Sequence, residues 1–445
     1  MLEYAIMMKV TEAFHKKLPQ GIDIMVEYQT AGNRRADLVI VNGFEILACI
    51  EIKSNISDEK LLLEAQAQVE LIQKDTHSYY AVITDGDRYY VKSLSNERFE
   101  EKRDAEAVIK VILGVDKEKE RDNDFDIESL RNYFSKICMK YDMISNINKI
   151  KKVLEGVSSA NCEVTATRFK FKRSFENAFF QSLLGTYTDK EIVRYIPFSS
   201  VFRTLNEQTI GMVSLVGMND VSECYYADQF CAKINNKEWT KGVLPAERSM
   251  LNNTYILSCN DLSMEDNLTM WRLYGDNCKG VCIKFIIEKD KLYKDETFIL
   301  APVSYGQDKD THYALEFVNS ILSIKIGDRE PLFETWCYWK HFFKDYRYSV
   351  EKEVRLLYTG NGLGKRDWIL VKENDIPCTI SVFPIKCAPN HSNDFPLTLK
   401  GIKIGSKCID IETKKSQLEE LIKERNVGYD RLYAEVSISE IDNYR

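Results

Sequence analysis

The chain has 445 residues, of which 44% are apolar and 29% charged, the composition of a globular protein with room for two or three domains. It contains no apolar run of about 18 residues and no basic-apolar leader, so we expect neither a membrane span nor a secretion signal, and a cytoplasmic location. A formal net charge of −7 argues against a chain-wide basic field for nucleic acid, which leaves only local patches such as Arg168, Lys170, Lys172 and Arg173.

The cysteines and histidines show no metal-binding spacing. Twelve cysteines are scattered without a Cys-x-x-Cys pair, and five histidines are dispersed. We therefore expect reduced, buried cysteines and no zinc motif.

Residues 1–113 predict an alternation of helices and strands. Residues 1–17 carry apolar side chains at helical spacing, and residues 22–29 form the first expected strand. Two β-branched strands flank Asn42-Gly43, a strong hairpin signal. A helix at 58–74 and a hairpin around 85–87 follow. This order predicts an α/β/α sandwich.

Three charged residues border the apolar strands of this hairpin. Asp37 opens its first strand, and Glu51 and Lys53 end its second. Glu51 and Lys53 are two residues apart and therefore share a face. Two carboxylates on rigid strands suit an oxygen-seeking divalent cation, and an adjacent ammonium suits an attacking water or a charged phosphorane.

Strand geometry sets a condition for this site. A two-residue loop at Asn42-Gly43 would pair Asp37 with Ala48 and send Asp37 and Glu51 to opposite faces of the sheet. The interpretation therefore requires an odd-length loop or a β-bulge.

An aspartate followed by Glu-x-Lys resembles the PD-(D/E)XK nuclease superfamily, including the N-terminal domains of type I restriction motor subunits. The resemblance implies that Asp37 and Glu51 hold Mg²⁺ or Mn²⁺ and that Lys53 orients the nucleophile. It also implies that a glutamine on the following helix lies near the cleaved phosphate, for which we choose Gln68.

The sequence also offers candidates for a third metal ligand and for phosphate contacts at this site. Glu12 on the first helix is a candidate third metal ligand, although an exposed helix glutamate is the simpler interpretation, and Glu27 is its rival. Arg34 and Arg35 are candidates for phosphate contacts.

Residues 114–189 form the second predicted region. Charge without apolar periodicity over 114–128 predicts a solvated linker, and 127–185 predicts two or three helices. Every fourth residue is large and apolar over one stretch, which favours a core face over base stacking: Phe171, Phe175, Phe179 and Leu183.

Residues 190–445 predict an α+β domain with a mainly antiparallel sheet. Its expected elements include an aromatic-rich helix at 332–348 and a strand at 351–358. Residues 190–410 resemble the bacterial family numbered 2971 in the domain-of-unknown-function series, in the motifs Arg194-Tyr195, Asn219-Asp220, Met270-Trp271-x-x-Tyr274, Lys279-Gly280-Val281 and Glu351-x-Glu353-x-Arg355. The family's usual Phe-Asn-Asp-Pro is interrupted here at Met218 and Val221.

A second chemistry is compatible with this domain. An arginine, a serine and a Glu-x-Glu on successive strands follow the order found in arginine-serine-glutamate ADP-ribosyltransferases, which use NAD. The matching positions are Arg194, Ser258, Glu351 and Glu353. The two glutamates could equally line the solvent face of a strand, and the domain could bind or sense without catalysis.

The sequence therefore predicts a metal-dependent nuclease effector that cleaves nucleic acid, with DNA favoured over RNA, in bacterial antiviral defence or abortive infection. The alternatives are an NAD-using transferase and a non-catalytic sensor. Restriction-type nucleases often act in pairs, so a homodimer is expected.

Overall fold

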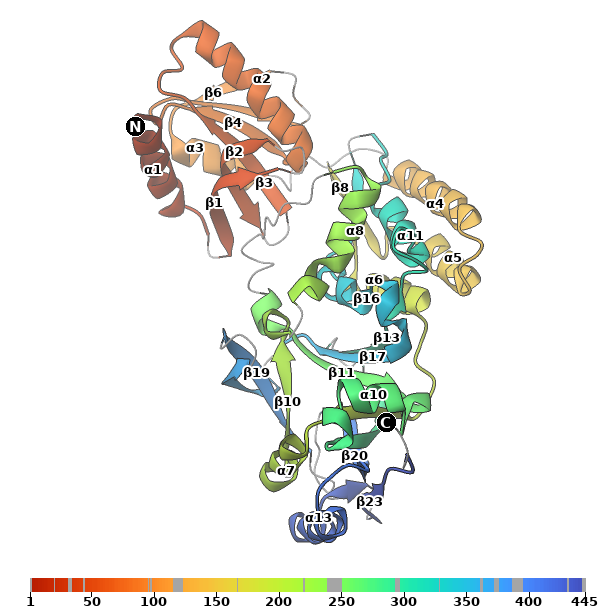
Figure 1. The fold of residues 1–445 in the computed structure, drawn as a ribbon. Helices are drawn as coiled ribbons and strands as arrows, with labels where there is room; N and C mark the ends of the chain where they lie inside the picture. Colours follow the sequence, from red (N-terminus) through yellow and green to blue (C-terminus); the bar gives the residue numbers. More distant parts are fainter. Residues whose placement is uncertain are drawn as a thin grey trace. The chain divides into compact units, whose positions relative to one another are not determined.

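The computed structural model describes residues 2–441 except 20, 31–33, 43–44, 95, 97, 115–122, 166, 219–220, 238–249, 293–296, 328, 361–362, 372–375, 386–394 and 430–431. The chain divides into two compact units (Figure 1). Unit 1 comprises Met1–Phe180, Asp228–Ser249 and Leu315–Cys337, and unit 2 comprises the rest. Two segments of the predicted C-terminal domain thus belong with the N-terminal part.

Unit 1 contains a six-stranded sheet whose strands follow chain order. These are β1 (Ile22–Gln29), β2 (Arg35–Asn42), β3 (Glu45–Ile52), β4 (Tyr80–Thr84), β5 (Tyr89–Ser93) and β6 (Glu100–Lys102). The pair β3–β4 is parallel because a helix crosses between these strands, and the other pairs are antiparallel.

Helices cover both faces of this sheet. Helices α1 (Leu2–His15) and α3 (Ala105–Ile112) pack on the face that contains Leu38 and Ile40. Helix α2 (Glu59–Thr76) packs on the opposite face with Val39 and Val41, and Asp58 caps its N-terminus. Alternating side chains of β2 thus enter two cores, which makes this part a three-layered α/β sandwich.

The region after the sandwich differs from the prediction. Helix α4 (Asn123–Lys140) begins inside the predicted linker, and residues 115–122 lie outside the described residues. After α5 (Ile147–Glu155), the chain forms strands β7 (Cys162–Val164) and β8 (Arg168–Phe171) before α6 (Arg173–Leu184). Helices α4, α5 and α6 agree with the two or three predicted helices, but the two short strands were not expected. Cys162–Val164 and Arg168–Phe171 each bury every second side chain, the period of a strand.

The spaced aromatic residues are core residues, as predicted. Phe171 stacks on Phe175 at 5.1 Å between ring centroids and lies 4.6 Å from Phe333. Phe333 follows β15 (Glu330–Leu332), which pairs with β8 in unit 1. The proposed basic patch is partly neutralised, because Arg168 pairs with Glu330 and Lys170 with Glu45.

Unit 2 is built on a ten-stranded, mainly antiparallel sheet, in agreement with the predicted α+β class. Its main path is β18 (Lys365–Val371), β19 (Ile376–Pro384), β10 (Thr209–Ser214), β11 (Tyr255–Asp261), β9 (Glu191–Ile196), β12 (Val281–Ile287), β20 (Leu397–Ile404) and β23 (Glu435–Ile438). Strand β17 (Glu353–Tyr358) pairs with β11 and with β13 (Phe298–Pro302).

The two faces of this sheet have different covers. Helices α7 (Phe198–Glu207) and α13 (Ile411–Arg425) pack on the larger core, and α10 (Leu268–Leu273) inserts Met270 and Trp271 on the other face. No disulfide joins the described cysteines. None of the described helices is long and apolar enough to cross a membrane.

The aromatic-rich stretch 332–348 is not one helix. It divides into α12 (Trp336–Trp339), a 3₁₀ turn, the short strand β16 (Phe343–Lys344) and a second 3₁₀ turn. Strand β16 pairs in parallel with β14 (Ser304–Tyr305), so tertiary pairing overrides the local helical pattern.

Glu176 provides a test of the packing in unit 1. Its buried carboxylate accepts hydrogen bonds from the backbone N–H groups of Glu334 at 3.0 Å and Thr335 at 2.6 Å. Glu176→Ala leaves both donors unsatisfied and should lower the free energy of unfolding of unit 1 by about 1–3 kcal/mol in urea titrations. Glu64→Ala, at an exposed site on α2, is the control, and an equal effect of both changes would contradict the role of Glu176.

Candidate functional site

A β-bulge brings the two acids of the hairpin to one face. Ile40 pairs with Ala48, but Val41 pairs with Ile46, so the register shifts by one residue and Leu47 is the extra residue. Beyond the bulge Leu38 pairs with Ile50, which sets Asp37 opposite Glu51. The geometric condition derived from the sequence is therefore met.

Both carboxylates are poorly solvated. Asp37 Oδ2 accepts a 2.7 Å hydrogen bond from the backbone N–H of Ile52, and burial raises the pKa of Asp37. Glu51 is 2% exposed, and its Oε2 is buried without a hydrogen-bond partner. Burial and then the nearby charge of Asp37 raise the pKa of Glu51 to about 7. The ionised forms of these two carboxyl groups are therefore energetically unfavourable in this site.

Lys53 lies beside this charge. Its Nζ donates to Glu51 Oε1 at 2.8 Å and to Gln68 Oε1 at 3.2 Å. Burial alone would lower the pKa of Lys53, but the hydrogen bond and charge of Glu51 raise it above its usual range. Gln68 reaches Lys53 from α2, so the structure brings these four predicted residues together.

The predicted third acid lies elsewhere. Glu12 is exposed and pairs with Lys16 at 2.6 Å, and Glu27 pairs with Arg35 at 3.4 Å. Glu3, in the first turn of α1, instead lies close enough for its charge to raise the pKa of Asp37 and Glu51. Glu3 and Glu12 are nine residues, or about 13 Å, apart along the helix, so one site cannot use both. The acidic first turn of α1 was the signal that sequence reasoning missed.

The two candidate phosphate-binding arginines are already paired. Arg34 Nη1 contacts Asp75 of α2 at 2.7 Å, and Arg35 contacts Glu27. The charge of Arg35 also reaches Asp37 and lowers its pKa, but less than burial raises it. Of the two arginines, Arg35 thus has the larger effect on the pKa of Asp37.

The donor set fits a divalent cation. Among the described residues, no group of three or more His, Cys, Asp or Glu side chains forms a ready-made metal cluster. The Asp37–Glu51 pair nevertheless offers oxygen ligands, and the buried, unpaired Glu51 Oε2 lacks the partner that a cation would supply.

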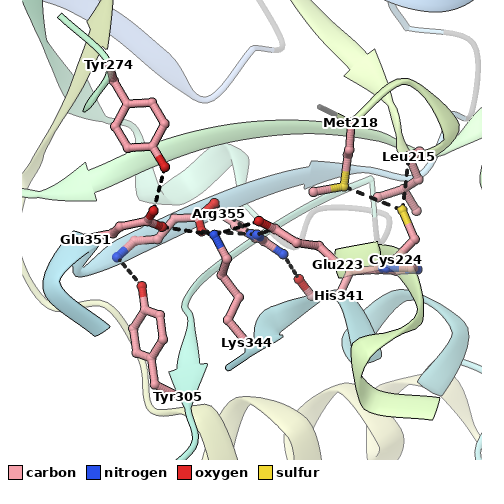
Figure 2. Close-up of polar contacts among 11 residues, drawn as sticks. Leu215, Met218, Glu223, Cys224, Tyr274, Tyr305, His341, Lys344, Glu351 and Arg355 are labelled. Atoms are coloured by element: carbon pink, nitrogen blue, oxygen red, sulfur yellow. Dashed lines mark hydrogen bonds and ion pairs between the residues drawn. The ribbon is translucent and has the colours of Figure 1, made fainter. Parts of the chain in front are cut away.

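Unit 2 contains a second cluster of charges (Figure 2). Lys344 Nζ contacts three carboxylates at 2.9–3.0 Å, those of Glu223, Glu351 and Glu353. Arg355 Nε donates to Glu353 Oε1 at 2.7 Å, and its Nη2 donates to Glu223 Oε2 at 2.5 Å. We call these five residues the Lys344 cluster. Three acids and two bases give it a net charge of −1.

Aromatic hydroxyl groups extend the Lys344 cluster (Figure 2). Tyr274 donates to Glu351 Oε1, and the hydroxyl of Tyr305 accepts from the backbone N–H of Glu353 at 2.8 Å. Burial would raise the pKa of Glu353, but Arg355 and Lys344 lower it to about 2. Glu353 is therefore a permanently charged partner and a weak proton acceptor.

The predicted Arg-Ser-Glu arrangement is only partly assembled. Ser258 lies opposite Arg355 and hydrogen-bonds to Glu353. Val193, however, pairs with Asn260, which pairs with Glu353, so the next residue, Arg194, faces the other side of the sheet. Arg194 lies beside Cys259, and burial lowers its pKa. The alternation of strand side chains thus separates Arg194 from Glu353.

Sequence reasoning missed Glu223 and Lys344 in this cluster. Lys344 lies in the stretch that the sequence pattern predicted to be a helix. Glu223 lies in a short 3₁₀ turn, Val221–Tyr225, more than 100 residues before its partners in the chain. The alternative that Glu351 and Glu353 line the solvent face of a strand is wrong, because both are buried. The Asn219-Asp220 motif lies outside the described residues.

Comparisons with known proteins support a relationship for the C-terminal part. Residues 270–356 match the family described as "Protein of unknown function (DUF2971)", a range that contains most of the Lys344 cluster. No curated protein matches. The solved structures include "cryoEM structure DrdV-DNA complex" at 14% identity and a TM-score of 0.19, covering 52% of this chain and 19% of that chain. A TM-score this low gives no information about the fold or the function of this chain.

The electrostatics of the acid pair can be tested by titration. Asp37→Asn removes a repelling charge and should lower the pKa of Glu51 from about 7, whereas Lys53→Met should raise it further. Carboxyl carbon chemical shifts measured by NMR against pH, assigned with Glu51→Gln, give both values. Glu12→Gln should leave the titration unchanged, and shifts of the same sign in the Asp37 and Lys53 variants would contradict the arrangement.

The sign of the linked stability follows from the raised pKa. The protonated form of Glu51 favours the folded state, so its contribution is fully present below the ordinary pKa of 4.5 and is lost as the pH rises through about 7.

The Lys344 cluster predicts a large effect of Arg355. Arg355→Met leaves the buried carboxylates of Glu353 and Glu223 without this partner and should lower the free energy of unfolding of unit 2 by about 3–5 kcal/mol. Arg347→Met, which removes an exposed pair with Asp345, should change it little. Urea unfolding followed by tryptophan fluorescence measures both, and a stable Arg355→Met variant would show that the cluster is not structural.

Proposed function

We propose that the protein is a divalent-metal-dependent nuclease that cleaves nucleic acid phosphodiester bonds through the Asp37–Glu51–Lys53 site of unit 1. The observation that carries the proposal is the β-bulge, because it turns the partly buried carboxylate of Asp37, the buried carboxylate of Glu51 and an ammonium to one sheet face. A purely structural hairpin gains nothing from placing two acids in repulsion. The fold around them, a sheet between α1, α3 and α2, is compatible with the α/β/α sandwich that the resemblance to PD-(D/E)XK nucleases implies.

Each residue has a defined task under this proposal. Asp37 and Glu51 would hold Mg²⁺ or Mn²⁺, and Glu3 would supply charge from α1. The cation would supply Lewis-acid chemistry, lowering the pKa of bound water and neutralising phosphate charge. The Lys53 ammonium, which donates a hydrogen bond to Gln68, would hold the attacking water or the charged phosphorane.

The test is cleavage by the full chain. The wild type should cut plasmid DNA or RNA with Mg²⁺ and not with EDTA, and Asp37→Ala should reduce the rate at least about a hundredfold. Asp23→Ala is the matched control, because Asp23 is an exposed acid on the adjacent β1 and makes no contact with the site. Equal activity of the two variants, or cleavage that persists in EDTA, would refute the proposal.

The NAD-using alternative has weaker support. Arg194 faces away from Glu353, and Glu353 is engaged by Lys344 and Arg355. We infer that Glu353 holds unit 2 together rather than stabilising a ribose cation. NAD consumption by the wild type that is lost in a folded Glu353→Gln variant would reverse this choice.

We place the nuclease in bacterial antiviral defence by analogy with fusions of restriction-type nucleases to uncharacterised domains. Phage challenge of cells that carry the wild type or the Asp37→Ala variant tests this role.

A further inference from the structure

The nuclease sandwich itself is poorly equipped to hold a polyanion. Residues 1–113 contain 19 acidic and 14 basic residues. Many of these basic side chains are already paired with carboxylates, including Lys9, Lys16, Lys17, Arg34, Arg35, Lys92, Lys102 and Lys110. A neutralised cation offers little to a phosphate backbone, so another surface must supply the salt-dependent contacts.

Helices α4 and α5 have the opposite character. Residues 131–155 contain six basic and two acidic side chains. The two helices pack side by side in unit 1 (Figure 1). Four of their lysines are exposed and make no ion pair with any described residue: Lys136, Lys140, Lys149 and Lys152. Their charge is therefore available to a partner.

The lysines are directed away from the core of unit 1. On α4 the core positions are Leu130, Phe134 and Cys138, and Lys136 lies on the opposite side of the helix. On α5 the buried side chains are Ile150 and Leu154, and Lys152 lies opposite them.

Aromatic rings accompany the charges. Lys136 Nζ lies 5.7 Å from the ring centroid of Tyr133, and Lys140 Nζ lies 5.3 Å from that of Tyr141. Tyr133 is 44% exposed. These contacts orient the lysine stems along the helix surface while leaving the ammonium groups exposed.

We propose that Lys136, Lys140, Lys149 and Lys152 form the surface of unit 1 that contacts the phosphate backbone of a double-stranded nucleic acid. Charge complementarity identifies the partner, because unpaired, exposed lysines on two adjacent helices suit regularly spaced phosphates. This inference rests on the proposed nuclease function and names where its substrate is held. Contacts of this kind give affinity without sequence specificity.

The test separates binding from cleavage. Full-length protein carrying Asp37→Ala, in EDTA, is titrated into a fluorescent DNA duplex of about 30 base pairs and a matching RNA duplex, and anisotropy is followed from 50 to 200 mM salt. Replacing the four lysines by Gln should weaken binding at least tenfold and reduce the slope of log K against log salt by roughly 3 to 4.

A charge-matched variant is the control. Lys16, Lys17, Lys102 and Lys110 are paired in the same unit, so their replacement by Gln should leave affinity and slope close to those of the parent. Equal binding by the two fourfold variants overturns the inference, and if the wild type still cleaves with Mg²⁺, the proposed function survives. Absence of both binding and cleavage refutes both.

A lipid surface is the competing partner, since Met139 on α4 and Met143 in the turn between α4 and α5 are exposed. Binding to phosphatidylserine vesicles that depends on the four lysines, without duplex binding, would overturn the inference in favour of a membrane. Duplex binding with no vesicle binding supports it, as does binding to both when only the duplex loses affinity in the fourfold variant.

Discussion

The candidate nuclease site depends on one residue of register. Without the β-bulge at Leu47, the period of two in a strand would turn Asp37 and Glu51 to opposite faces of the sheet. With the bulge, the two acids lie on one face of the sheet, where burial and mutual repulsion disfavour their charged forms. The pKa of Glu51 is therefore raised to about 7, and its Oε2 has no hydrogen-bond partner. Lys53 and Gln68 relieve only part of that cost. A buried site that is incompletely compensated is what a binding site for a cation requires.

The Lys344 cluster shows the opposite balance. There, two cations neutralise most of the charge of three acids, and Lys344, Arg355 and Tyr274 provide hydrogen bonds for the carboxylates. The pKa of Glu353 falls to about 2 instead of rising. Compensation of most of this charge favours a structural role, in which β16, β17 and the turn that carries Glu223 are held together. The contrast between the two clusters favours our proposal that catalysis takes place in unit 1.

The two units also share the chain unequally. Segments 228–249 and 315–337, which fall inside the predicted C-terminal domain, belong to unit 1. Strand β15 supplies Glu330, which pairs with Arg168 and contacts His77 at the end of α2. The chain that continues from β15 reaches Lys344 of the cluster 12 residues after Leu332. The family-matched range 270–356 therefore contributes residues to both units.

The sequence by itself determined the elements of the sandwich and the identity of its acids. Period-two and period-3.6 patterns are local, and the Asn-Gly turn fixes the order of the strands. The register argument required either an odd-length loop or a bulge, because strand side chains alternate between the two faces. Only the tertiary structure showed that the charge of Glu3, and not that of Glu12, acts on the acid pair, because the placement of α1 determines which acid lies near the hairpin. The tertiary structure also determined that Arg194 faces away from Glu353, because the face depends on the pairing of β9 with β11. It likewise determined that Lys344 lies in a strand, because β16 pairs with β14, which is distant in sequence.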